Sequence, residues 1–167
     1  MLPGVTCTRL GADRCPGLLK PFVAQDGAII RLRVPGGRVR VSTLADLLAI
    51  GADHGAPLLS VTSRTNLQVR GLPDPLPEDV MVRAEATGLL PSPSHERARN
   101  ILAAPLAPDL QPLVAELDAA LCADPFLADL PGRFLFAVTD ATGAVLTEPV
   151  DAAYQALTPT SGVIRLA

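Results

Sequence analysis

The residues of this sequence that could do chemistry are arginines and amides spaced two apart. One stretch carries four of them in alternation: Arg64, Asn66, Gln68 and Arg70. An earlier stretch carries Arg31 and Arg33 with the same spacing. Residues two apart on a strand share a face, and a guanidinium binds a carboxylate through two hydrogen bonds. If the two stretches are strands of one sheet, they predict a surface that binds a ligand with several carboxylates.

The ordinary alternative is a one-sided sheet whose polar face meets water, which is the usual outcome for alternating strands. Spacing alone favours this alternative. Arginine supplies thirteen of the 14 basic residues, but a sequence rich in alanine, proline and arginine is explained as well by the base composition of a genome. The positions of the arginines, and not their number, therefore have to decide between the two interpretations.

The other reactive side chains form no recognisable pattern. His54 and His95 are not at metal-ligand spacing with a cysteine or with each other. Cys7, Cys15 and Cys122 contain no Cys-x-x-Cys pair, so we expect neither a disulfide framework nor a metal site. With 3% aromatic residues, no tryptophan and a net charge of −3, no nucleic-acid partner is expected.

Length and hydropathy indicate the general class of protein. A chain of 167 residues of which 49% are hydrophobic is about one domain long and can bury a core. No uninterrupted apolar stretch reaches the roughly 18 residues that a membrane span needs. Together with the cysteine pattern, this predicts a cytoplasmic protein without a membrane partner.

Hydrophobic periodicity and turn residues predict the elements of the first half. Ser42 is the expected N-cap of a helix that Gly51 or Gly55 ends, and the strand after it is expected to bend near Ser63. Four segments are expected: an irregular segment over 1–26, a strand over 27–34, the helix from 42, and a strand over 57–71.

The second half is predicted in the same way. A turn sequence at 139–143 indicates a hairpin, and apolar residues at three- and four-residue intervals over 109–123 indicate a helix. Five elements are expected: a helix from Pro77 to Gly88, a short strand over 97–102, the helix over 109–123, a hairpin of 134–138 with 144–146, and a strand over 162–166. Because strands and helices alternate without a βαβ rhythm, the predicted fold class is α+β.

Three blocks of sequence resemble the sirohaem-dependent nitrite and sulfite reductases. They are residues 30–37 (IRLRVPGG), 62–71 (TSRTNLQVRG), which is the most specific, and 99–102 (RNIL). Three further blocks resemble precorrin-3B synthase in particular, a member of this superfamily in aerobic cobalamin biosynthesis: 13–17 (DRCPG), 95–100 (HERARN) and 130–134 (LPGRF). The resemblance implies a ferredoxin-like half domain over 27–90, preceded by the segment 1–26 and followed by a partial sirohaem-type α+β domain over 91–167.

The resemblance also implies roles for individual residues. Arg31 and Arg99 match arginines that face the bound anion in the reductases, so they are the expected catalytic residues. The expected contacts to the carboxylates of a tetrapyrrole are Arg64, Asn66, Gln68, Arg70 and Arg133. With these matches the carboxylate-binding interpretation replaces the ordinary one.

This sequence departs from the reductases in two respects. A Lys-x-Lys pair of the reductases corresponds here to Arg133 and Leu135, and leucine neither binds an anion nor carries charge. This weakens a sulfite or nitrite reductase assignment and affects precorrin-3B synthase less. The family also implies sirohaem or a tetrapyrrole substrate and a 4Fe-4S cluster held by four cysteines of a C-terminal half, a pattern that the three cysteines here do not resemble.

Three functions follow as alternatives. The first is the N-terminal part of a precorrin-3B synthase-like oxidoreductase, incomplete alone, as a fragment, a truncated gene product or one subunit of a split enzyme with a separate C-terminal half. The second is a tetrapyrrole-binding module without redox chemistry. A fragment of a sulfite or nitrite reductase is a further alternative. The third is a structural domain that associates with itself or a partner through exposed sheet edges or apolar surface.

Overall fold

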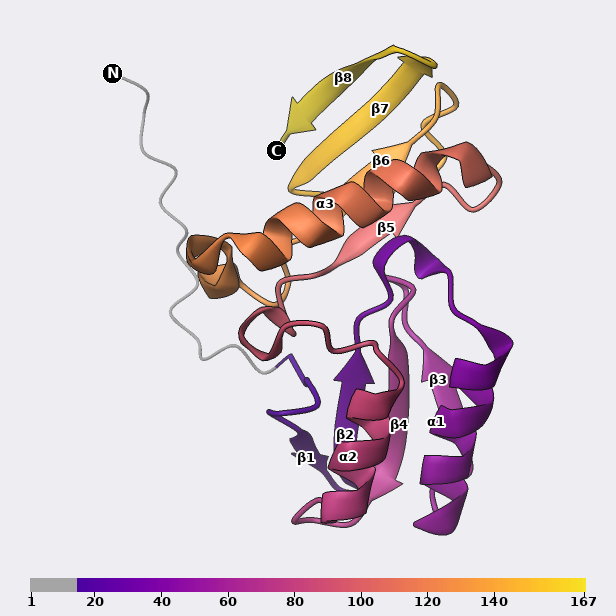
Figure 1. Cartoon of the computed structure of the whole chain (residues 1–167), viewed down its shortest axis with the longest axis vertical. Coiled ribbons are helices and arrows are strands. Elements are labelled where there is room, and N and C mark those ends of the chain that lie inside the picture. The colour runs from indigo at the N-terminus through magenta and orange to yellow at the C-terminus, as the bar shows by residue number, and fades with distance from the viewer. Residues whose placement is uncertain (1–14) are drawn as a thin grey trace.

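The computed structural model describes residues 15–167, which form two four-stranded sheets and three α-helices (Figure 1). The first half contains β1 (Phe22–Ala24), β2 (Gly27–Leu32), α1 (Val41–Asp53), β3 (Leu59–Val61), β4 (Leu67–Leu72) and α2 (Glu78–Ala86). The second half contains β5 (Ile101–Ala103), α3 (Gln111–Ala123), β6 (Phe136–Thr139), β7 (Ala152–Thr158) and β8 (Ser161–Leu166). Short 3-10 helices are η1 (Pro35–Gly37), η2 (Pro93–His95), η3 (Pro108–Leu110) and η4 (Pro125–Asp129). This mixture confirms the predicted α+β class.

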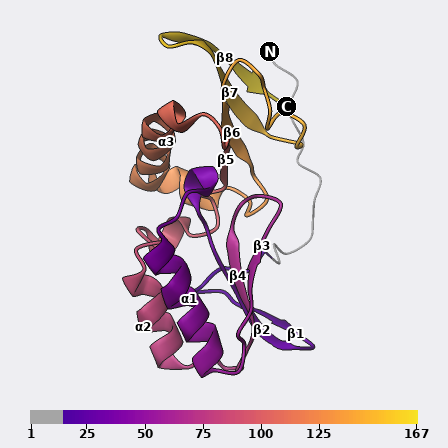
Figure 2. The same cartoon turned by 90° about the vertical axis from the view of Figure 1, so that its right-hand side faces the viewer.

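The first sheet is antiparallel throughout, in the order β1-β2-β4-β3. Alternation along β2 and β4 directs Ile30 and Val69 into the core beneath α1 and α2. The same alternation directs Arg31 and Gln68, which are paired in the register, to the opposite face. Figure 2 shows both helices on one side of this sheet, so we call the opposite side its free face.

The helices of the first half follow the prediction except at one cap. α1 begins after Arg40, which makes no side-chain cap, so the predicted N-cap role of Ser42 is wrong and Ser42 lies in the first turn. The helix continues through Gly51 and stops just before Gly55. Gly55 has a φ of 76°, a conformation that glycine adopts without strain. α2 lies within its predicted span.

The segment 57–71 is a hairpin of β3 and β4, and the prediction of one bent strand is wrong. Its turn holds Thr65 at a φ of 58°, and the Thr65 N–H donates to the Thr62 carbonyl at 2.9 Å. A threonine rarely adopts positive φ, and no glycine marks the turn. Arg64 therefore lies in a turn and not on a strand.

The second sheet has the order β5-β6-β7-β8, with β5, β6 and β7 parallel and β8 antiparallel to β7. α3 packs on one face, over Ile101 and Val138. The loop between β6 and β7 packs Val145 against Leu102 on the other face. The expected hairpin of 134–138 with 144–146 is wrong, because β6 pairs with β5 and β7 and residues 144–146 form turns.

Two strands were not expected. β7 begins with Ala152 and Ala153, and alanine is depleted in strands, so local propensity did not reveal it. β1 falls in the segment expected to be irregular, and Phe22 pairs with Ile29 of β2. The expected strand over 97–102 is shorter and shifted, because β5 begins at Ile101.

Residues 13 and 14 of the block 13–17, and Cys7, lie outside the described residues. Within the described part, no helix has the length and apolar character to cross a membrane. The predicted division into 1–26, 27–90 and 91–167 stays a prediction.

Candidate functional site

The centre of the free face is the pair Arg31 and Gln68. Opposite each other on β2 and β4, they form a hydrogen-bonded unit when the Gln68 amide oxygen faces the guanidinium. In that orientation the oxygen accepts from Nη2 of Arg31 at 2.6 Å and from Nε at 3.0 Å. Burial lowers the pKa of Arg31 from its ordinary value. Gln68 therefore fixes the guanidinium without neutralising it.

Two further residues come close to Arg31 from other segments. The negative charge that Cys15 can carry raises the pKa of Arg31, and the positive charge of Arg64, in the β3–β4 turn, lowers it. The main contact of Arg64 is a 2.7 Å hydrogen bond from Nη1 to the carbonyl oxygen of Arg133, in the second half of the chain. The charge of Arg64 thus acts on Arg31 from the place where the β3–β4 turn contacts the second half of the chain.

Neither of these two guanidiniums has a carboxylate partner among residues 15–167: the ion pairs of the described residues involve other arginines. Arg31 and Arg64 are both partly buried, so their mutual repulsion is screened less than at an exposed surface. An anion placed between them would relieve this repulsion.

Arg70 lies on the same face but in a different situation. Its Nε and Nη2 both approach Oδ2 of Asp26 at 3.3 Å, and both side chains are close to half exposed. An exposed ion pair of this kind is weak. Arg70 is therefore partnered within the chain.

Asn66 does not lie on the free face, although its spacing predicted this. It is 2% exposed; its Oδ1 accepts from the Val34 N–H at 3.1 Å, and its Nδ2 donates to Oδ1 of Asn100 at 2.9 Å. Asn100 in turn donates to the Gly132 carbonyl at 3.0 Å. Asn66 thus joins the two halves of the chain from inside, and the structure separates it from Arg31 and Gln68.

Arg33 was expected beside Arg31 on the polar face, and this expectation is wrong. Strand β2 ends at Leu32, so the alternation stops before Arg33. The side chain is 1% exposed and its Nη1 donates to the Pro16 carbonyl at 3.3 Å. Arg33 is thus a buried contact to the segment that precedes β1.

Arg99, the second expected catalytic residue, lies in a buried ion pair. It is 3% exposed, with Nε and Nη2 donating to the two carboxylate oxygens of Asp118 at 2.7 and 2.6 Å. Its Nη1 donates to the Leu89 carbonyl at 2.9 Å. The pair ties α3 to the connection after α2, so the structure does not bring Arg99 to the free face.

Arg133, the last of the expected site residues, has an exposed side chain. It contacts Arg64 through its backbone carbonyl oxygen and not through its guanidinium.

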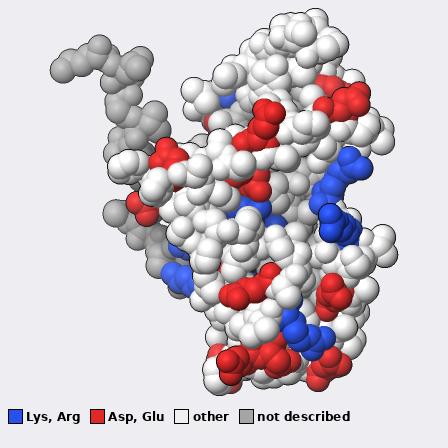
Figure 3. Space-filling model, viewed as in Figure 1, with Lys and Arg blue, Asp and Glu red and all other residues white. Residues whose placement is uncertain are grey.

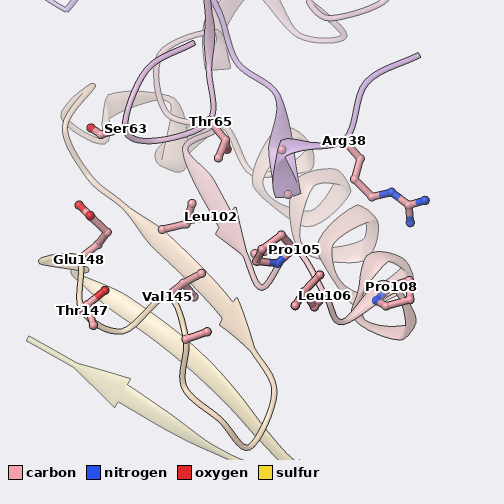
Figure 4. Close-up of a pocket in the computed structure, with 14 residues that line it drawn as sticks. Arg38, Ser63, Thr65, Leu102, Pro105, Leu106, Pro108, Val145, Thr147 and Glu148 are labelled. Carbon is pink, nitrogen blue, oxygen red and sulfur yellow. The ribbon is translucent and has the colours of Figure 1, made fainter. Parts of the chain in front are cut away.

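A separate cavity of about 770 Å³ lies where η1 and the β3–β4 turn meet the second sheet (Figure 4). Ser63 and Thr65, on either side of Arg64 in the β3–β4 turn, line it. Its wall is mostly apolar and includes Leu102 and Val145, while Arg38 extends away from them (Figure 4). This cavity has few polar groups that could bind a carboxylate, and none of the expected site residues line it. Sequence reasoning missed it, because Ser63 and Thr65 lie in a turn, where strand parity gives no direction.

The helix-bearing side of the molecule carries charges of both signs, and acidic side chains gather where α1 ends and α2 begins (Figure 3). There His54 contacts Asp79 at 2.9 Å, and Arg83 contacts Asp53 at 2.9 Å. The hydrogen bond from His54 is the largest cause that lowers the pKa of Asp79. This side does not form an anion-binding surface.

The first half of the chain matches a known family model. Residues 23–86 match the nitrite/sulfite reductase ferredoxin-like half domain. The match begins inside β1 and ends with the last residue of α2. The first sheet with its two helices is therefore similar to that half domain.

Among solved structures, the Mycobacterium tuberculosis NirA protein is similar, with a TM-score of 0.62 and 21% sequence identity. The similarity covers 86% of this chain, so it extends beyond residues 23–86 into the second half and shows a shared fold there too. This chain spans 29% of the length of NirA. No curated protein matches the chain significantly.

The two groups that the resemblance implies differ in how they fit. Two neighbouring guanidiniums without carboxylate partners among the described residues suit a tetrapyrrole, which carries carboxylates on its rim. For a 4Fe-4S cluster, the part of the chain that the structure describes contains no group of three or more histidine, cysteine or acidic residues that could hold a metal ion. These residues therefore fit the tetrapyrrole and do not fit the cluster.

Proposed function

We propose that this chain forms the arginine-bearing side of a tetrapyrrole site, as the N-terminal part of a precorrin-3B synthase-like oxidoreductase. The observation that carries this proposal is that Gln68 orients Arg31 on the free face while Arg31 has no carboxylate partner among residues 15–167. Arg64, in the β3–β4 turn, adds a second positive charge that acts on Arg31. The family match of residues 23–86 supports the choice of a tetrapyrrole over a simple anion.

The chemistry of the proposed site is carboxylate binding. Arg31 and Arg64 each accommodate one carboxylate of the macrocycle, and the charge-assisted hydrogen bonds hold the ring in one orientation over the free face. Arginine stays protonated in proteins, so the site keeps its charge even though burial lowers the pKa of Arg31. A bound tetrapyrrole would be the group on which the redox chemistry takes place, and the residues described here would bind and orient it.

Titration of the chain with sirohaem, followed by absorbance, tests this proposal. We expect saturation at one equivalent, and a loss of roughly 1–3 kcal/mol of binding free energy in Arg31→Ala and in Arg64→Ala. Arg83→Ala is the matched control, because Arg83 is an arginine of similar exposure in α2, on the helix-bearing side. Unchanged affinity in both free-face variants, or an equal loss in Arg83→Ala, would contradict the proposal.

A further inference from the structure

The turn that carries Arg64 is held in one conformation by its own hydrogen bonds. The Thr65 N–H donates to the Thr62 carbonyl at 2.9 Å, and the Asn66 N–H donates to Oγ1 of Thr62 at 3.1 Å. The φ of 58° at Thr65 is one that a threonine adopts only where its surroundings impose it. The backbone of Arg64 is therefore fixed, and the contacts of its long side chain decide where the charge lies.

The guanidinium of Arg64 contacts a second turn, in the other half of the chain. Residues 131–134 form this turn, and a 2.7 Å hydrogen bond from the Phe134 N–H to the Pro131 carbonyl closes it. Nη1 of Arg64 donates to the Arg133 carbonyl at 2.7 Å. Because a carbonyl oxygen orients a guanidinium without neutralising it, the position of this turn sets the position of a positive charge.

Asn100 holds the same turn from its buried side. Its Nδ2 donates at 3.0 Å to the Gly132 carbonyl, which directly precedes the carbonyl of Arg133. Asn100 is 1% exposed, and its own backbone carbonyl accepts from the Phe136 N–H of β6 at 2.9 Å. Since only the two dihedral angles of Arg133 separate the two carbonyls of the closed turn, fixing the Gly132 carbonyl also fixes that of Arg133.

Asn66 connects Asn100 back to the turn that carries Arg64. Its Nδ2 donates to Oδ1 of Asn100 at 2.9 Å, from a position two residues after Arg64. The side chain of Asn100 thus contacts both turns, with its oxygen toward the first and its nitrogen toward the second. The contacts form a closed circuit, in which the backbone near Arg64 and the guanidinium of Arg64 are fixed to the same buried amide.

We propose that Asn100 is a positioning residue for the ligand site. Its hydrogen bond to the Gly132 carbonyl holds the Arg133 carbonyl in place, and this carbonyl holds the guanidinium of Arg64. The consequence for tetrapyrrole binding rests on the proposed function, whereas the placement of the guanidinium does not. The two consequences are therefore measured separately.

The side-chain NMR signals of arginine measure the placement without a ligand. A guanidinium held by a hydrogen bond rotates slowly and gives separate signals for its Nη groups, whereas one that is not held gives an averaged signal. The signals that disappear in Arg64→Ala identify Arg64. We expect separate signals in the original chain and an averaged signal in Asn100→Ala. Averaging in the original chain, or separate signals in Asn100→Ala, would overturn the proposal.

Asn66→Ala is the matched control. It also removes a buried hydrogen bond of Asn100, but it leaves the donor to the Gly132 carbonyl in place. The Arg64 signals should therefore stay separate, and averaging in both variants would assign the effect to general loosening between the two halves and not to Asn100.

Asn100→Asp replaces Asn100→Ala if the latter does not fold. Its carboxylate keeps the acceptor for Asn66 and has no donor for the Gly132 carbonyl. The same averaged Arg64 signal is expected, and separate signals would count against the proposal in the same way.

Titration with sirohaem measures the consequence for binding. Asn100→Ala should bind roughly fivefold to tenfold more weakly, as expected when about one hydrogen bond is lost. In an Arg64→Ala background it should have no further effect, because it acts through Arg64. Additive losses, or a loss in Arg64→Ala alone, would overturn the positioning role and leave the proposed function standing. Absence of binding by the original chain would contradict the proposed function, and the NMR signals would still decide the role of Asn100.

Discussion

Arg31 and Arg99 each have a guanidinium group, but the two groups lie in different surroundings. Arg31 is half-buried on the free face, is held by a neutral amide, and has no carboxylate partner among residues 15–167. Arg99 is 3% exposed and both carboxylate oxygens of Asp118 accept hydrogen bonds from it. A guanidinium that is positioned but not neutralised can take an external carboxylate, whereas one bound to an internal carboxylate supports the fold. We therefore propose ligand binding for the first region, whereas the ion pair of the second holds parts of the chain together.

The largest expected effect is on the buried region. Asp118→Ala leaves Arg99 buried without its partner, and should lower the free energy of unfolding by about 3–5 kcal/mol. Denaturant unfolding measures this value. The matched control is Asp26→Ala, which breaks the exposed pair with Arg70 and should cost less than about 1 kcal/mol. Similar losses in the two variants would remove the distinction between buried and exposed arginine pairs.

Asn66 sharpens the comparison, because the resemblance and the structure give it different roles. Asn66→Ala leaves the Val34 N–H and Oδ1 of Asn100 without their partner, and should cost roughly 1–3 kcal/mol of folding stability. Sirohaem affinity of the folded variant should stay close to that of the original chain. If affinity falls while the unfolding midpoint is unchanged, Asn66 belongs to the ligand site as the resemblance implied.

Arg31→Lys tests the geometric part of the comparison. Lysine keeps the charge but loses the planar fork that two hydrogen bonds need. We expect a loss of roughly 1 kcal/mol in sirohaem binding, smaller than that of Arg31→Ala, with the unfolding free energy nearly unchanged. Isothermal titration and denaturant unfolding of the same preparation measure the two quantities. A stability loss equal to that of Asp118→Ala would place Arg31 in the same class as Arg99.

The smallest effect is expected at Arg70, which shares the free face but has an internal partner. Arg70→Ala should change sirohaem affinity by less than about 0.5 kcal/mol, since Arg70 is exposed and the Asp26 carboxylate beside it would repel a carboxylate of the ligand. Competition titration against the original chain resolves a difference of this size. A loss as large as that of Arg31→Ala would extend the ligand site along the whole of β4.

The residues that sequence reasoning placed correctly lie inside regular strands. Arg31 and Gln68 share a face because β2 and β4 keep their alternation at these positions. Arg33 and Asn66 were misplaced for the opposite reason: each lies just outside a strand, where parity no longer determines direction. The turn at Thr65 contains no glycine that would indicate a turn in the sequence. The start of β4, which determines the direction of the Asn66 side chain, could therefore not be predicted.

The role of Arg99 could not be predicted for a different reason. Its partner Asp118 lies on α3, 19 residues along the chain, and only the packing of α3 on the second sheet brings the two together. β7 was missed because its pairing with β6 is parallel and links residues distant in sequence. Helix α2 and the core face of β2 were predictable, since their apolar spacing and end residues are local signals.

The most direct test of the central claim compares sirohaem with its fully methyl-esterified form in titrations of the original chain. Esterification removes the carboxylates and leaves the macrocycle and its iron in place. If Arg31 and Arg64 bind carboxylates, sirohaem should saturate at one equivalent, and the ester should bind at least about tenfold more weakly, since each lost charge-assisted pair is worth about 1.5–3 kcal/mol. Equal affinity for the acid and the ester would contradict the assignment of the free face as a carboxylate site.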